Sequence, residues 1–530
     1  MSTAYIALLV LLAIYVPVYI WVYRNPEKAE RLHLVKYGPA LMVKTRLGIS
    51  AMGRIGRYRR FWRAFGFVSK LVSAVLLLLM MYTLVVALMA LPSMIGSSSV
   101  GIEYALAIPG FNPILPLSYG IVALLFAMVV HEMGHGIQAR SNGIDVDSTG
   151  LLYAVVPLGA FVEPSEEQMK VAPRRPRMDV YAAGITVNTF CAIAAILILM
   201  LSCASISSPY EDDPGVYGMD KGSPAFASGI PLTALVTGAS EEGSPTVYPL
   251  ESAVASGVVS MQFEDPGRTF DPTKRYILHY DYKGESGSTA TAVQMGAFVK
   301  SVVKSSPADS AGLSPGEFLY SITIGGEERL IGTVQEFTSA MRTTSPGDSV
   351  VIATVAVSSD PTVVYHDPVV LSSSGGVGFL GVVVNMGGFA LTTPGILMDK
   401  AASPFSANDG TPISYVKSFL GYLSGPMNGM SPIPDNVKWW YDAPAGDLTW
   451  IFLSLLYWIF WLDILLAISN ALPAYPFDGG FIFAGWIDWV LEKAGMRDQE
   501  RREDTGGKVA AAISNVVLLM FVMVIVSFLI

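Results

Sequence analysis

The sequence predicts a polytopic α-helical membrane protein with a β-rich extracytosolic insert between its membrane-spanning portions. Of its 530 residues, 52% are hydrophobic and only 15% are charged, and the mean hydropathy is +0.48. Soluble domains carry about a quarter charged residues, so much of this chain must lie in lipid. The apolar residues gather in long stretches toward both ends, whereas the middle has short apolar runs between Gly, Pro and Ser, which is typical of small β domains.

Six segments are long and apolar enough to cross a bilayer. A helix needs about 20 consecutive apolar residues to span a ~30 Å hydrocarbon core. The segments are 4–23, 71–92, 180–203, 448–472, 509–530 and 117–138, the last of them apolar only as far as His131. We therefore expect two membrane portions, 1–203 and 448–530, on either side of an insert over 204–447. The first segment lacks a positive leader and a small-residue cleavage site, so we expect a retained anchor.

The distribution of Lys and Arg predicts the orientation. Residues 24–63 hold eleven of them, 139–179 and 473–508 hold five each, and 93–116 hold none. Because cytoplasmic loops are enriched in Lys and Arg, we expect both termini and the insert to be extracytosolic. The insert carries 25 Asp and Glu against 12 Lys and Arg, which argues against a nucleic-acid partner for that face.

The insert contains a weak internal repeat. The segment 222–230 (GSPAFASGI) recurs as 305–313 (SSPADSAGL). The second copy continues into a Pro-Gly-Glu turn, a helical pattern over 334–341 and a strand over 349–355, and it resembles a PDZ domain of membrane and periplasmic proteases. Such domains bind an extended peptide by strand addition. The first copy lacks the Pro-Gly-Glu continuation, so the sequence allows two PDZ-like domains, one with a large insertion, or a plain turn-rich β domain.

A metal-binding pattern ends the 117–138 span, where the sequence reads HEMGH. Residues four apart share a face of a helix, so His131 and His135 can bind one ion. Catalytic zinc takes three protein ligands and a water, and Glu132, next to the first histidine, can accept the proton of that water. Ionisable residues inside an apolar span are costly and usually functional. The pattern therefore favours a zinc hydrolase over two buried histidines with a structural glutamate.

The candidates for the third zinc ligand can be narrowed by elimination. The other three histidines lie in the basic loop or the insert. The remaining candidates are Cys191 and the carboxylates Glu103, Glu163, Asp179, Asp463, Asp478 and Asp488. Asp478 stands out, because two prolines and two glycines break the helix around it, and irregular backbone at membrane depth is tolerated where it lines a cavity. Its predicted position is on the same cytoplasmic side as His131. Asp463 is an alternative ligand, or a buried hydrogen-bonding partner.

These elements together resemble the site-2 protease family of intramembrane zinc metalloproteases, in its PDZ-containing, prokaryotic type. The resemblance rests on the HExxH span, the intervening PDZ-like region, and Asn470-x-x-Pro-x-x-x-Phe-Asp478-Gly, where Phe477 replaces the commoner leucine. It implies one Zn²⁺ per chain held by His131, His135 and Asp478, with Glu132 as the base. It also implies that Asn470 helps to hold the substrate or the oxyanion.

Two further segments are candidates for substrate binding. The family's Ala-Gly-x-x-x-Asn element matches 183–188 and ends at Asn188. The apolar stretch 150–164 is too short and too interrupted to cross as a helix. We expect a membrane-dipping hairpin whose residues Gly159, Ala160 and Phe161 pair with an extended substrate, as the resemblance suggests; the alternative is an ordinary interfacial loop.

The expected function is intramembrane proteolysis, in a multi-pass protein of a prokaryotic plasma membrane with its active site toward the cytoplasm. The expected partners are the lipid bilayer and membrane-protein substrates that another protease has already trimmed. One rival is a non-catalytic PDZ-bearing receptor or scaffold with a structural zinc site, but such sites have four protein ligands. A second rival, a transporter, is disfavoured because no inverted repeat relates the membrane halves.

Overall fold

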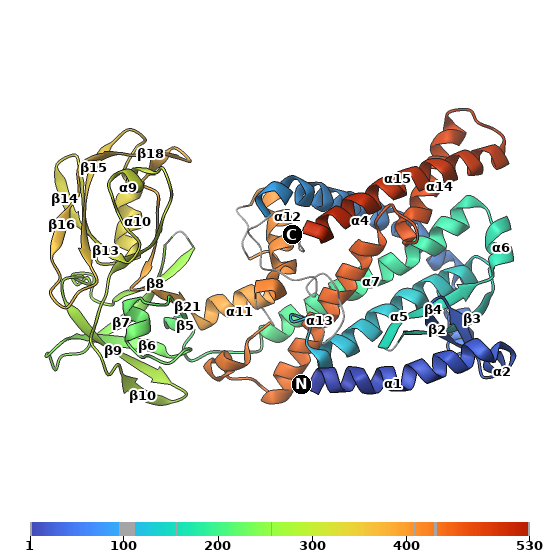
Figure 1. Ribbon diagram of the computed structural model, residues 1–530, viewed down its shortest axis with the longest axis horizontal. Helices are drawn as coiled ribbons and strands as arrows, with labels where there is room; N and C mark the ends of the chain where they lie inside the picture. The colour runs from blue at the N-terminus through green and yellow to red at the C-terminus, as the bar shows by residue number, and fades with distance from the viewer. Residues whose placement is uncertain are drawn as a thin grey trace. The chain divides into compact units, whose positions relative to one another are not determined.

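A computed structural model describes residues 3–94, 112–154, 156–255, 257–406, 410–428 and 432–527. The chain divides into two compact units. The first, called here the membrane unit, comprises Met1–Ser202, Leu420–Ser431 and Ile451–Ile530. The second, called the β unit, comprises Cys203–Phe419 and Pro432–Trp450. Figure 1 labels many of the elements of both units.

The membrane unit is built on long apolar helices. Within the described residues, five are long and apolar enough to cross a bilayer: α4 (Arg59–Met94), α5 (Leu117–Ser141), α7 (Arg174–Cys203), α13 (Asp447–Asn470) and α15 (Gln499–Ser527). They match five of the six predicted spans. The remaining predicted span falls in helix α1 (Thr3–Arg24), and the total of six remains a prediction. The most apolar window of α13 is 67% buried against 17% for α4 and α15, so α13 is the most buried of these five helices.

A four-stranded antiparallel sheet packs against α5. Its strands are β1 (Leu34–Tyr37), β2 (Ala40–Thr45), β3 (Val146–Ala154) and β4 (Val156–Pro164), in that order, with β4 at the edge. The hairpin expected over 150–164 is present as β3 and β4. The sequence did not predict that the basic loop 24–63 adds two strands to it. The same loop holds the short helices α2 (Pro26–Arg31) and α3 (Ile49–Gly56), and α6 (Glu166–Val171) follows β4.

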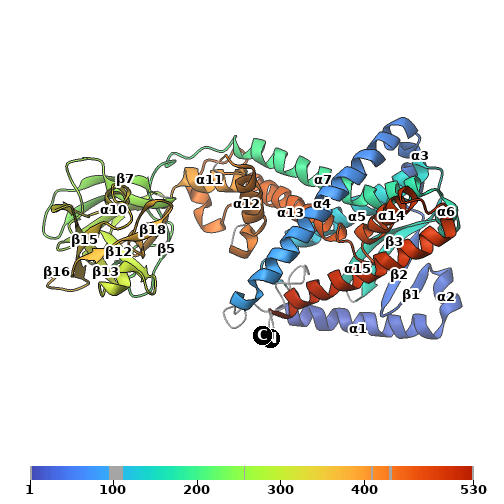
Figure 2. The ribbon, with the colours of Figure 1, turned by 90° about the horizontal axis from the view of Figure 1, so that it is seen from above.

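The break after α13 is a tight loop that returns the chain onto α14 (Asp478–Lys493), which lies beside α15 (Figure 2). Gly479 and Gly480 make this possible. A Cβ at Gly479 would lie 2.4 Å from the Ala471 carbonyl oxygen, and one at Gly480 would lie 2.7 Å from the carbonyl carbon of Ala474. Only glycine therefore lets the first turn of α14 pack against this loop. Asp478 is the first residue of that turn.

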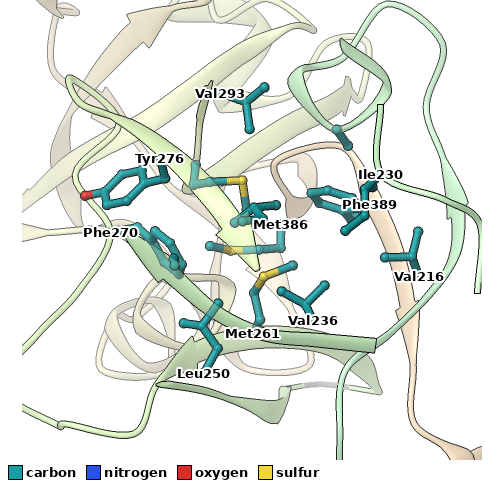
Figure 3. Packing of buried hydrophobic residues seen from close by; sticks show 14 of the residues in the cluster. Val216, Ile230, Val236, Leu250, Met261, Phe270, Tyr276, Val293, Met386 and Phe389 are labelled. Carbon is teal, nitrogen blue, oxygen red and sulfur yellow. The ribbon is translucent and has the colours of Figure 1, made fainter. Parts of the chain in front are cut away.

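The β unit contains one sheet of fifteen strands that encloses two hydrophobic cores. Most elements of the first core, drawn in Figure 3, precede the second in the chain. They are β5 (Gly215–Met219), α8 (Pro224–Ala227), β6 (Leu235–Glu241), β7 (Tyr248–Ala255), β8 (Val258–Phe263), β9 (Arg275–Tyr282), β10 (Glu285–Ser288), β11 (Val293–Gln294) and the returning strand β21 (Phe389–Thr392).

The second core is nested inside the first along the chain. Its elements are β12 (Ala297–Val302), α9 (Pro307–Ser310), β13 (Glu317–Ile324), β14 (Glu327–Leu330), α10 (Val334–Arg342), β15 (Ser349–Ala356), β16 (Val363–Tyr365), β17 (Val369–Val370), β18 (Ser372–Ser374), β19 (Val377–Phe379) and β20 (Val382–Met386). Helices α11 (Pro394–Ala402), α12 (Pro412–Leu423), η2 (Gly425–Asn428) and η3 (Asp435–Trp440) then lead to α13. The β-rich character of the insert is confirmed, and its PDZ identity remains a prediction.

Candidate metal centre and active site

The two histidines of the HExxH pattern lie one turn apart on α5 and are both buried. Their ring centroids are 4.7 Å apart and the rings are nearly perpendicular. Potential ligand atoms of His131, His135 and Glu132 all lie within 4.8 Å of one another. The helical spacing in the sequence therefore produces the expected cluster.

Asp478, the first residue of α14, lies beside this cluster although it is far from the histidines in the sequence. Its Oδ2 lies 3.1 Å from His131 Nε2 and 3.2 Å from His135 Nε2. Although buried, this oxygen makes no well-aligned hydrogen bond to any described residue. Zinc ligands at about 2.0–2.1 Å in a tetrahedral site lie roughly 3.3 Å from one another. The three atoms thus have the spacing and chemistry that a zinc ion requires.

The orientation of His135 is fixed from outside the cluster. Its Nδ1 lies 2.8 Å from the Val180 carbonyl oxygen on α7, to which it can donate a hydrogen bond. Such a bond leaves the lone pair of Nε2 directed toward the ligand position, as is usual for metal-binding histidines. A main-chain acceptor carries no side-chain signal, so the sequence did not point to Val180.

Gly184 explains the Ala-Gly-x-x-x-Asn element. A Cβ at this position would lie 2.5 Å from His135 Nε2 and 2.8 Å from His131 Cε1. Helix α7 can therefore reach both imidazoles only with glycine here. One turn further, the fully buried Asn188 donates from Nδ2 to the Ala127 carbonyl on α5 at 3.2 Å, while its Oδ1 has no partner among the described residues.

Glu132 is held by the edge strand of the small sheet. Its Oε2 accepts a hydrogen bond of 2.8 Å from the Val162 backbone N–H of β4. The three residues of this strand that were predicted to bind substrate, Gly159, Ala160 and Phe161, pair with Leu152, Leu151 and Gly150 of β3. Val162 was not predicted as a site residue. The base candidate and the predicted substrate-binding strand are therefore in direct contact.

Asn470 is the last residue of α13. Its Nδ2 donates to the Leu466 carbonyl at 3.0 Å, within its own helix, and its side chain is half-buried. The amide is thus anchored to the end of a helix, a few residues before the loop that leads to Asp478. The described contacts do not bring it to His131 or His135.

The other ligand candidates among the described residues have different surroundings. Glu163 accepts hydrogen bonds from Lys44 and Ser148, Asp179 pairs with Lys70, and Asp488 pairs with Arg174 and Arg502. Cys191 is a free thiol, and Glu103 lies outside the described residues. Asp463 is fully buried near Cys191, and neither of its oxygens has a described hydrogen-bond partner. Asp463 is therefore buried as expected, and its hydrogen-bonding role remains a prediction.

A profile of peptidase family M50 matches residues 119–514, which is more than half of the chain and includes both halves of this cluster. The chain belongs to peptidase family M50, the site-2 protease family. Members of the M50 family are zinc-dependent membrane metalloproteases, in keeping with the His-Glu-His cluster and the apolar helices.

Two relatives accompany the family match. The chain is 29% identical over 205 residues to an uncharacterized protein of Methanocaldococcus jannaschii, which covers 38% of this chain and 53% of that protein. It is 28% identical over 101 residues to the membrane-bound transcription factor site-2 protease homolog of Arabidopsis thaliana. This alignment covers 18% of this chain and 20% of that protein. The match thus spans about half of the first relative's length and a fifth of the second's.

Proposed function

We propose that this M50 protein hydrolyses peptide bonds within or beside transmembrane segments of other membrane proteins, in regulated intramembrane proteolysis. The observation that carries the proposal is the convergence of His131, His135 and Asp478 beside Glu132. The first three would hold one zinc ion, and Glu132 would be the general base. The site belongs to helices α5 and α14 of a unit built on membrane-spanning helices, which supports a substrate that is itself in the membrane.

The chemistry divides between the ion and the protein. When bound, zinc acidifies water to a pKa of about 7 and polarises a carbonyl. Glu132 accepts a proton from the attacking water as its oxygen bonds to the scissile carbonyl carbon. As the carbon–nitrogen bond breaks, Glu132 donates that proton to the leaving amine. The N–H of Val162 holds the carboxylate of Glu132 in place between these two transfers.

Two asparagines are proposed to act on the substrate. Asn470 would donate a hydrogen bond to the oxyanion, for which its amide must turn from the Leu466 carbonyl. Asn188, one helical turn from Gly184, has a buried Oδ1 that no described residue contacts through a hydrogen bond. This acceptor suits a backbone N–H of an unwound substrate, because an unpaired N–H is costly in lipid.

Strand β4 would bind the substrate in an extended form. Among the described residues, β4 pairs only with β3, on one side. Backbone groups of alternate residues face opposite edges of an antiparallel strand. Since the Val162 N–H points to Glu132, Ala160 presents its N–H and C=O to the same free edge. An added substrate strand would therefore run beside the base.

We also propose an orientation in the membrane and a class of substrate. The Lys and Arg distribution supports extracytosolic termini and β unit, with the site toward the cytoplasm. The β unit would select substrates that another protease has already trimmed. A scaffold with a structural zinc is less well supported, since the described residues offer three close ligand side chains and structural sites use four.

The test is Glu132→Gln in detergent micelles with a transmembrane model substrate. We expect cleavage to fall by at least about a hundredfold, in line with loss of a general base, while bound zinc stays near one per chain. Glu166→Gln is the matched control, because Glu166 on α6 is an exposed carboxylate that pairs with Lys170, and this variant should cleave like the unchanged protein. Undiminished cleavage by Glu132→Gln would refute the catalytic assignment. In cells, the same variant should accumulate a trimmed membrane-protein precursor.

A further inference from the structure

Paired contacts connect helices α7 and α14 at regular intervals on the side of α14 that leads away from the metal centre. Three residues after Asp478, the ring of Phe481 stacks on that of Tyr181, with centroids 4.6 Å and planes 10° apart. One turn further along α14, a Cβ at Gly485 would lie 2.7 Å from Met178 Cγ. Each step moves three or four residues along each helix, in opposite directions. One face of α14 therefore packs antiparallel on one face of α7.

The next contact in this series is ionic. Arg174, the first residue of α7, places Nη1 2.7 Å from Asp488 Oδ2 and Nη2 2.7 Å from Glu492 Oε2. One guanidinium thus binds two carboxylates that lie one turn apart on α14. Stacked rings and a close glycine contact leave two helices some freedom to slide, whereas a planar guanidinium fixes the direction of each bond. Arg174 therefore fixes the position of α14 along α7.

The metal centre lies at the other end of the same series of contacts. Asp478 stands ten residues before Asp488 on α14, and Gly184 stands ten residues after Arg174 on α7. Ten residues of helix span about 15 Å. At that distance from the ion pair, α7 meets both imidazoles at Gly184, and α14 brings the Asp478 carboxylate to them. The two helices therefore approach the metal centre from a common ionic anchor over equal lengths.

The surroundings of Asp488 allow this anchor to be tested without unfolding the protein. Asp488 is 8% exposed, and its Oδ1 also lies 3.1 Å from Nε of Arg502 on α15. Arg502 in turn donates to the carbonyls of Met496 and Arg497, between α14 and α15. A buried ion pair is costly to break when the remaining charge has no partner. Loss of the Arg174 charge leaves Asp488 paired with Arg502, and it removes the bond from α14 to α7.

A second arginine on the same helix provides the comparison. Arg177 lies one turn after Arg174, and its Nη2 is 2.6 Å from Glu503 Oε1 on α15. The side chains of this pair are 27% and 39% exposed, against 22% and 12% for Arg174 and Asp488. Ion pairs that water reaches contribute little. Arg177 therefore matches Arg174 in residue type and helix, but it binds α15 rather than α14.

We infer that Arg174 is a positioning residue of the metal centre, which holds α14 where Asp478 reaches His131 and His135. Arg174 acts through α14 and is not itself a ligand, because about 15 Å of helix separates it from the cluster. The inference rests on the proposed function in that the cluster binds zinc. Zinc ligand distances tolerate deviations of about 0.2 Å. A small shift of α14 therefore lowers metal affinity, by about 10–100-fold where a supporting contact is lost.

The experiment compares Arg174→Gln with Arg177→Gln in the full chain in micelles. We expect Arg174→Gln to release zinc to a chelator at least about tenfold faster than the unchanged protein, and Arg177→Gln to release it at the unchanged rate. Arg174→Lys, which keeps the charge but not the fixed two-pronged geometry, should release zinc at an intermediate rate. Without zinc, Arg174→Gln should unfold near the temperature of the unchanged protein, whereas the rise on adding zinc should be smaller.

Two results would overturn the inference. One is equal zinc release from Arg174→Gln and Arg177→Gln. The other is a fall in unfolding temperature of Arg174→Gln that is the same with and without zinc, because a merely structural ion pair predicts that. Hydrogen exchange of residues 481–485 in the zinc-free protein gives an independent measure, and it should accelerate in Arg174→Gln but not in Arg177→Gln. If the unchanged protein bound no zinc, the proposed function would fail, and unaltered exchange at 481–485 would still refute the role of Arg174.

Discussion

Gly184→Ala tests whether the close approach of α7 builds the metal centre, since it adds one methyl group and changes no ligand. The new Cβ would lie 2.5 Å from His135 Nε2, where ordinary contact begins near 3.4 Å. His135 cannot simply rotate away, because its Nδ1 lies 2.8 Å from the Val180 carbonyl. An imidazole or the helix must therefore move by about 0.9 Å. Overpacking of this kind costs about 1–3 kcal/mol.

The displacement matters more for zinc than for folding. Zinc ligand distances tolerate deviations of about 0.2 Å, and loss of supporting contacts lowers metal affinity about 10–100-fold. We expect Gly184→Ala to fold, to lose at least half its zinc after dialysis against a buffered chelator, and to cleave a model substrate at least tenfold more slowly.

Metal analysis and thermal unfolding on the same sample would check this. Gly507→Ala on α15 is the matched control, because a Cβ there meets no atom within 4 Å. It should retain zinc and activity. Full zinc occupancy and normal cleavage in Gly184→Ala would show that the site tolerates a wider separation of α7 and α5, and the reasoning from the close approach would be wrong.

Three further outcomes are expected. Asp478→Ala should reduce bound zinc to below about a tenth per chain, whereas Asp463→Asn should retain it; the reverse result would make Asp463 the ligand. Val162→Pro removes the N–H that donates a hydrogen bond to Glu132, so kcat should fall about tenfold with zinc retained. An unchanged kcat would show that this hydrogen bond from β4 does not affect the base. The Lys44 ammonium and the Ser148 hydroxyl lower the pKa of Glu163. Its ion pair therefore stabilises β4 above the unfolded pKa of about 4.3 and loses this effect as pH falls through the lower folded value. Hydrogen exchange of β4 should accelerate there, but not in Glu163→Gln.

Much of the metal centre could be predicted from local pattern and exclusion. The spacing of His131 and His135 follows from helical geometry, and the scarcity of histidine left Cys191 and a few carboxylates as candidates for the third ligand. Asp478 was distinguished by the prolines and glycines around it, and the structure places its oxygen beside both imidazoles. The five long apolar helices among the described residues were predictable because a backbone exposed to lipid must be helical and carry apolar side chains.

The parts that could not be predicted depend on main-chain groups and on distant pairing. The Val162 N–H and the Val180 carbonyl hold Glu132 and His135, and every residue type carries such groups. The pairing of β2 with β3 joins residues about a hundred positions apart, and the basic composition of 24–63 concealed it. The repeated segments 222–230 and 305–313 share a short sequence pattern. That pattern did not predict that the hairpin β7–β8 follows the first segment, whereas helix α10 follows the second.

If a substrate pairs along β4 as proposed, the single hydrogen of the Val162 amide limits how far that pairing can extend. That hydrogen is already given to Glu132, so it cannot also bond to an added strand. A peptide that pairs only as far as Ala160 leaves the carboxylate anchored. A peptide that extends to Val162 must release it. If β4 binds the substrate and Glu132 is the base, as proposed, the depth to which a substrate enters the edge would be coupled to the freedom of the carboxylate, and residues remote from the cleaved bond would influence hydrolysis.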